Sequence, residues 1–144
     1  IAILFAVYGI AGVISSTIAG SAIDTLGAPR TTRVALVFVI FGLAIWSLSG
    51  ASMLLAALGL VIWGMGGGPA VAAQQARLIA ADPNAASATV ALNSSLLYAG
   101  QAIGTALGGW RLSNGHADKS GWLAVALIAI ALVASIAAQR RFSA

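Results

Sequence analysis

Charged side chains are what this sequence has least of. Asp and Glu number 3 and Lys and Arg number 7 among 144 residues, so only 7% of the chain is charged, against about 25% in a typical soluble domain. Hydrophobic residues make up 60% of the chain, and the mean hydropathy is +1.02. Because so few polar residues could not cover a soluble exterior, the composition predicts an integral membrane protein.

Other absences narrow the function. The chain has no cysteine, which excludes a disulfide framework and a thiolate metal site. No Asp, Glu, Lys, Arg or His lies in the middle of an apolar run, so we expect no intramembrane enzyme, no metal site and no cofactor. The net charge of +4 does not indicate nucleic-acid binding, because the basic residues do not cluster on one face. The single histidine, His116, is expected to be plain loop surface.

The apolar residues fall into five runs, each near the length of about 20 residues that crosses a bilayer. Strand-like alternation is absent, and a backbone inside lipid must satisfy its own hydrogen bonds, so these runs are predicted as helices. The chain begins without a methionine or a basic leader and is expected to be entered partway through a transmembrane helix or just before one. The prediction is an all-α integral membrane domain with five transmembrane helices, at about 1-22, 31-48, 53-76, 85-110 and 121-138.

Basic residues in the short loops predict the orientation. Five lie on one side of the predicted spans and two, Arg111 and Lys119, on the other. The richer side, which includes the C-terminus, is therefore expected to face the cytoplasm. Its basic residues are Arg30, Arg33, Arg77, Arg140 and Arg141.

The spans differ in their side chains. The spans 31-48 and 121-138 carry almost no polar groups and suit lipid-facing positions. Two others carry small residues at four-residue intervals, which let helix backbones approach closely. This spacing fits either a moving helix–helix interface or ordinary tight packing. The small residues are Gly12, Ser16 and Gly20 in the first span and Gly100, Gly104 and Gly108 in the fourth.

Two further features lie in the third and fourth spans. Gly66, Gly67, Gly68 and Pro69 interrupt the third and predict a kink or an unwound turn, which either borders a substrate site or improves packing. The fourth carries a polar stripe that serves either interhelical hydrogen bonds or a solute path. The stripe consists of Ser94, Tyr98, Gln101 and Thr105, with Asn93 beside it.

Residues 20–33, GSAIDTLGAPRTTR, contain the most recognisable spacing: glycine at 20, aspartate at 24, glycine at 27 and arginine at 30. This pattern resembles the cytoplasmic loop signature of the major facilitator superfamily in its weaker second copy, between the eighth and ninth helices. Thr25 and Ala28-Pro29 stand where the family carries basic residues. The stretch from Gln74 to Gly109 is similar to the tenth and eleventh helices of drug:proton antiporters, closest to the arabinose-efflux-permease-like group.

The resemblance implies that the five spans are helices eight to twelve of a twelve-helix transporter, most of its C-terminal half. It implies efflux of small molecules from bacteria by alternating access with proton antiport, in the inner membrane. The ninth and twelfth helices would be peripheral. The implied partners are the lipid bilayer, the missing N-terminal half, a small-molecule solute and protons. The coupling acid would lie in the missing part.

The resemblance also gives residues their roles. It implies that Asp24 helps to hold the cytoplasmic side closed, and we expect Asp24 to pair with Arg77 or Arg30. A solvated loop that merely obeys the positive-inside rule is the alternative. The gating motif comprises Gly20, Asp24, Gly27, Arg30 and Arg77. The expected substrate path comprises Trp63, Asn93, Tyr98 and Gln101. A rival to transport is a small multi-span scaffold that binds a partner through the glycine-spaced face of the fourth span.

Overall fold

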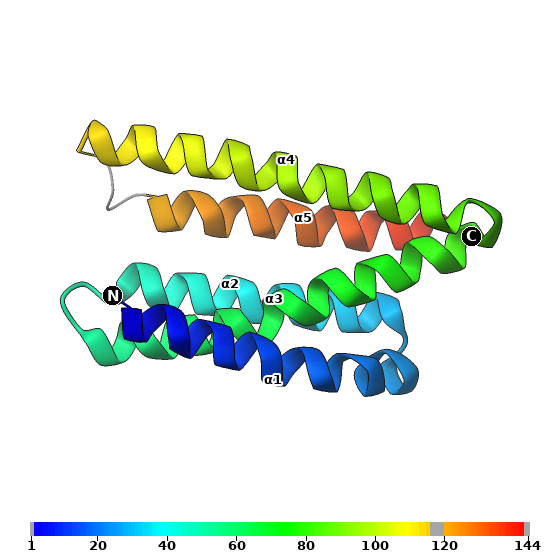
Figure 1. Ribbon diagram of the computed structural model, residues 1–144, viewed down its shortest axis with the longest axis horizontal. Helices are drawn as coiled ribbons and strands as arrows, with labels where there is room; N and C mark the ends of the chain where they lie inside the picture. The colour runs from blue at the N-terminus through cyan, green and yellow to red at the C-terminus, as the bar shows by residue number, and fades with distance from the viewer. Residues whose placement is uncertain (1, 116–119, 143–144) are drawn as a thin grey trace.

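The structure is a computed structural model that describes residues 2–115 and 120–142, all of them in helices or short turns (Figure 1). His116 and Lys119 lie outside the described residues. No strand occurs in the described part, as the sequence predicts. The elements are α1 (Ala2–Leu26), α2 (Ala28–Leu48), α3 (Met53–Ala81), the short 3-10 helix η1 (Pro83–Ala85), α4 (Ala86–Ser113) and α5 (Ser120–Phe142).

Four of these helices are long and apolar enough to cross a membrane, namely α1, α2, α3 and α5. Helix α4 is also long enough, but its polar stripe and glycines make it less apolar, and it is not among the four. Four helices therefore support a multi-pass membrane protein, while the fifth span stays a prediction. Consecutive long helices run up and down. The α1–α2 turn, the α3–α4 turn and the C-terminus gather at the same end (Figure 1).

The loop predicted between the first two spans, residues 23–30, is almost entirely helical. Helix α1 continues to Leu26 and α2 begins at Ala28, so the connection is Gly27 alone, which has a φ of 80°. A side chain is strained at that φ, whereas glycine adopts it freely. Pro29 then lies in the first turn of α2, where its missing N–H costs nothing. The Thr31 hydroxyl donates to the carbonyls of Ala22 (3.0 Å) and Gly27 (3.1 Å), which fastens the two helix ends together.

Helices α2 and α3 pack most closely, through a pair of facing glycines. A Cβ on Gly59 would lie 2.6 Å from the Trp46 backbone nitrogen and 2.8 Å from the Gly42 carbonyl oxygen. A Cβ on Gly42 would in turn lie 2.7 Å from the Gly59 carbonyl oxygen. Real Cβ contacts are not this short, so both positions must be glycine for the backbones to meet as they do.

Helix α1 packs on another side of α3 by the same means. A Cβ on Gly64 would lie 2.7 Å from the Tyr8 carbonyl oxygen. The buried Ser15 hydroxyl donates across this contact to the Gly64 carbonyl (3.2 Å) and also reaches the Gly12 carbonyl of its own helix (3.0 Å). Helices α1, α2 and α3 therefore form one packed unit with α3 in contact with both others.

The predicted interruption of α3 does not unwind it. The helix stays α-helical from Met53 to Ala81, through the three glycines and Pro69. Of the predicted kink or unwound turn, the unwound turn does not occur, because neighbouring helices hold the segment: Gly66 faces the Ala35 carbonyl of α2, and Gly68 faces the Ser16 side chain of α1. Figure 1 shows α3 changing direction along its length and rising toward α4, a bend that a proline inside a helix explains.

The expectation that residues 31-48 form a peripheral, lipid-facing helix is wrong for one side of α2. That helix contacts α1, α3 and α5 and buries six residues. Its other side, with Val34, Val37 and Phe41, is exposed as expected. Hydropathy alone cannot separate the two sides, because protein-facing and lipid-facing side chains are equally apolar in a membrane helix.

The last two helices attach less tightly. Helix α5 packs against α2, where the buried Gly121 meets the Ser47 side chain. Helix α4 lies at the outer edge of the arrangement in Figure 1, contacts α3 and η1, and buries no residue. Arg111 of α4 donates to the Ser120 hydroxyl of α5 at 3.3 Å. The described chain is therefore a packed three-helix unit with two more loosely held helices.

The glycine contact between α2 and α3 gives a first prediction. Replacing Gly59→Ala should destabilise the protein by about 1–3 kcal/mol, because the added methyl overpacks a backbone contact. The matched control is Gly104→Ala, at a site with nothing within 4 Å, which should be neutral or stabilising because alanine favours helix. Thermal unfolding followed by circular dichroism in detergent checks this. Equal melting temperatures for the two variants would contradict the packing described.

Candidate functional site

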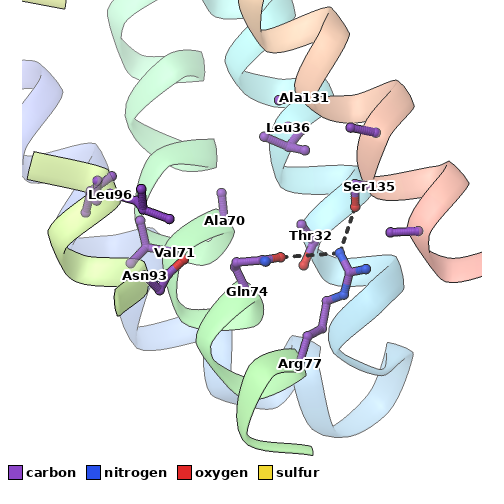
Figure 2. A pocket seen from close by; sticks show the side chains of 13 residues that line it. Thr32, Leu36, Ala70, Val71, Gln74, Arg77, Asn93, Leu96, Ala131 and Ser135 are labelled. Atoms are coloured by element: carbon purple, nitrogen blue, oxygen red, sulfur yellow. Dashed lines mark hydrogen bonds between the residues drawn. The ribbon is translucent and has the colours of Figure 1, made fainter. Parts of the chain in front are cut away.

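A hollow with several polar side chains lies between α2, α3, α4 and α5 (Figure 2). Its volume is about 570 Å³. Five polar side chains line it, and the remaining lining is leucine, valine and alanine. The polar residues are Thr32 of α2, Gln74 and Arg77 of α3, Asn93 of α4 and Ser135 of α5.

Arg77 is the charged group of this hollow. Its guanidinium Nη1 donates to the Ser135 hydroxyl at 2.7 Å and to the Gln74 side-chain oxygen at 3.3 Å (Figure 2). The side chain is half-buried. Helix α3 therefore places a cation against α5, and the lone polar residue in the apolar length of α5 receives it.

The expected ion pairs of Asp24 do not form. No ion pair joins Asp24 to Arg77 or Arg30 in residues 2–115 and 120–142, and both Asp24 and Arg30 are exposed. The reason is the direction of Arg77, whose guanidinium turns to α5 and lies within electrostatic range of Arg33 on α2. The expected pairing of Asp24 with Arg77 or Arg30 is therefore absent among the described residues, and Arg77 contacts Gln74 and Ser135 instead.

The other residues of the expected gating motif have simple surroundings. Gly20 is exposed, with nothing within 4 Å of an added Cβ. Gly27 forms the one-residue connection between α1 and α2. These positions describe a compact helix-to-helix turn with its charges pointing outward, and their role in gating stays a prediction.

The four residues expected on a substrate path do not come together. Trp63 stacks at a tilt on Tyr8 of α1, with ring centroids 5.0 Å apart. Asn93 lines the Arg77 hollow. Tyr98 and Gln101 are exposed on α4, and the Tyr98 side chain is 67% exposed. The predicted path thus combined residues from three separate surfaces, because the sequence shows which residues of a helix are polar but not which helices are neighbours.

A second hollow lies on the face shared by α1 and α3. It encloses about 510 Å³ beside the glycine-rich stretch of α3. Tyr8, Ser16 and Thr17 of α1 supply its polar groups, and the Tyr8 hydroxyl lies 3.5 Å from where a Cβ of Gly67 would be. The bend of α3 therefore borders an open hollow with hydroxyl groups, and whether a substrate binds there stays a prediction.

The two predicted small-residue faces have different surroundings. Gly12 and Ser16 lie against Gly64 and Gly68 of α3, so this face packs within the chain. An added Cβ at Gly100, Gly104 or Gly108 would meet nothing within 4 Å. The glycine face of α4 is therefore uncovered by any described residue.

Several residues of importance were missed by sequence analysis. Gly42 and Gly59 make the closest helix contact, and each is an isolated glycine in an apolar run, the signal that could have found them. Ser135 is the single polar side chain in residues 121–138 and could have been noticed on that ground. Nothing in the sequence pointed to its partner, because Arg77 lies 58 residues away.

Comparison with known proteins adds no family. No protein-family profile, no curated protein and no solved structure matches this chain. The described residues also hold no group of three His, Cys, Asp or Glu side chains that could bind a metal ion.

The Arg77–Ser135 contact gives a second prediction. Replacing Ser135→Ala should destabilise the protein by about 1 kcal/mol, because a half-buried cation loses its shortest hydrogen bond. The control is Ser95→Ala, whose hydroxyl donates only to the Ala91 carbonyl of its own helix and whose loss should be near neutral. Thermal unfolding in detergent measures both. A Ser135→Ala protein as stable as the control would show that the contact contributes nothing.

Proposed function

We propose that this chain is the C-terminal portion of a secondary active transporter of the major facilitator type. In this proposal it exports small molecules across a bacterial inner membrane by alternating access, with proton antiport. Its C-terminus lies in the cytoplasm. The support is the four membrane-spanning helices, the glycine and aspartate spacing of residues 20–33, and the surface of α4.

The surface of α4 is the observation that carries the proposal. The helix buries no residue, and its polar stripe is uncovered along most of its length. Uncharged polar groups facing lipid lack hydrogen-bond partners, so such a stripe belongs against protein or water. The packing of α4 within this chain is therefore incomplete. The helix suits the wall of a hydrated path between two halves of a transporter.

The hollow between α1 and α3 supports the same proposal. It combines hydroxyl groups with the aromatic ring of Tyr8, which packs on Trp63 outside the hollow, beside a proline-bent helix. Small-molecule sites are concave and mostly apolar with a few polar groups, and transporters place them beside interrupted helices near the bilayer midplane. A solute would contact Tyr8, Ser16 and Thr17 on this face.

The packing also suits the mechanical part of alternating access. The one-residue turn at Gly27 and the glycine contacts of α3 make α1, α2 and α3 a single rigid unit. Rocking of one half against the other needs such a unit and a surface on which it can slide. The glycine face of α4 is a smooth surface of this kind. No ionisable group lies in the middle of the spans, so the proton carrier belongs to the other half.

A multi-span scaffold is the second candidate, and the same glycine face favours it. Gly100, Gly104 and Gly108 form the spacing by which membrane helices dimerise. A permanent partner helix would cover them without any solute. Transport measurements separate the two candidates, because a scaffold moves no solute.

A third prediction tests the proposal on the full-length gene product. Gly104→Leu should lower transport by about tenfold, because a bulky side chain on the sliding face raises the free energy of one of the two states by about 1.4 kcal/mol. The control, Ala137→Leu, enlarges an exposed side chain of α5 and should transport within about twofold of wild type. Proton-driven accumulation of a panel of lipophilic dyes in inverted membrane vesicles gives the rates.

The outcomes are distinct. Wild-type transport with a specific loss in Gly104→Leu supports the transporter. Absence of proton-coupled movement of every dye, together with a stable complex that Gly104→Leu disrupts, would replace it with the scaffold. Equal transport by both variants would remove the role given to the glycine face.

A further inference from the structure

The hollow between α2, α3, α4 and α5 has a charge that no described residue compensates. A guanidinium has five N–H donors, and Arg77 uses one nitrogen, Nη1, for its two hydrogen bonds, both to neutral oxygens. No carboxylate in the described residues pairs with it. Asp82 accepts from the backbone N–H groups of Asn84 and Ala85 instead, and Asp24 is exposed at the end of α1.

The surroundings make this charge more unusual. Arg33 of α2 lies within electrostatic range of Arg77, so a second positive charge adds to the first. Arg77 is also half-buried beside apolar side chains, where a charge is costly unless it is paired. An anion beside Arg77 would lower the free energy of both groups.

The hollow is polar at one end and apolar at the other. Thr32, Gln74, Arg77 and Ser135 lie toward the end of the helices where the connecting turns gather, and Leu36 and Ala131 lie one helical turn further in (Figure 2). A third hollow, of about 580 Å³, adjoins it at the end of α3 and shares Gln74 and Arg77 in its wall. The Arg77 guanidinium therefore stands between an apolar slot and an opening at the helix ends.

We propose that this hollow binds an amphiphile with a single anionic head group, a carboxylate or a phosphate. The head group accepts hydrogen bonds from the free N–H groups of Arg77, a charge-assisted contact. The Asn93 side-chain amide offers a further donor in the same wall, whereas the Thr32 hydroxyl already donates to the Ala28 carbonyl. The apolar tail lies between α3, α4 and α5, against Val71, Leu97 and Ala131.

Size and charge both fit this ligand class. The volume of about 570 Å³ lies within the range of about 300–1,000 Å³ of small-molecule sites. A cationic amphiphile would meet Arg77 with like charge, and a neutral one would leave the charge of Arg77 uncompensated. The site is separate from the hollow of α1 and α3, and the proposal does not depend on whether the protein transports a solute.

Binding of a fluorescent fatty acid tests the proposal. The protein is placed in phosphatidylcholine nanodiscs, and dansyl-undecanoate is titrated with empty discs as background. Wild type should bind saturably. Arg77→Gln should raise the dissociation constant by about tenfold or more, which is the scale of a charge-assisted hydrogen bond. Arg30→Gln removes an exposed arginine at the same end of the helices and should bind within about twofold of wild type.

Two further variants guard against misfolding of Arg77→Gln. Arg77→Lys keeps the charge and should bind more tightly than Arg77→Gln. Ala131→Phe fills the apolar slot from an exposed position on α5 and should weaken binding by about tenfold while leaving Arg77 in place.

Competition identifies the source of the ligand and can overturn the proposal. Displacement of the dye by dodecanoate but not by phosphatidylglycerol in the discs supports a free anionic amphiphile. Displacement by phosphatidylglycerol supports a phospholipid. The proposal is overturned if dodecyltrimethylammonium displaces the dye as well as dodecanoate does. It is also overturned if Arg77→Gln binds as tightly as Arg30→Gln, or if wild type shows no saturable binding.

Discussion

The backbone contact between Gly42 of α2 and Gly59 of α3 is the constraint on which the rest of the arrangement depends. In a bilayer, apolar side chains gain little by leaving lipid for protein, so helices associate through close backbone approach and hydrogen bonds. The two facing glycines allow that approach, and Gly64 and Gly66 extend it to α1 and to the other end of α2. This packing fixes the direction of α3, and with it the position of every group that α3 carries.

The position of α3 determines the hollow that it shares with α1 and the hollow that it shares with α2, α4 and α5. On one side, its glycine-rich stretch and its bend leave space beside Tyr8 and Ser16 of α1. On the other, its last turns carry Gln74 and Arg77 into the space between α2, α4 and α5. Helix α4 takes little part in the packing and offers an uncovered polar stripe and glycine face instead. The fold thus combines a packed unit of α1, α2 and α3 with α4, whose polar and glycine faces no described residue covers.

The sequence predicted the class and the helices well, because apolar runs and backbone hydrogen bonding leave few choices in a membrane. It failed where the answer depends on neighbours. Residues 23–30 were expected as a loop between two spans, but Gly27 alone suffices for the turn. Helix α2 was expected to be peripheral, yet one side of it is packed. Arg77 was expected to meet Asp24, but the direction of its side chain depends on Ser135, which lies on a helix that the sequence could not place.

The environment of α4 is the most direct test of the account. The chain has no cysteine, so single spin labels can be attached to this segment at Gln101→Cys and, as a lipid-facing comparison, at Val133→Cys on the exposed side of α5. Accessibility to oxygen and to a water-soluble nickel complex is measured by electron paramagnetic resonance in the full-length protein in membranes. The account predicts that residue 101 is reached by the nickel complex and residue 133 by oxygen. A label at residue 101 that behaves like the one at residue 133 would contradict a hydrated, protein-lined path along α4.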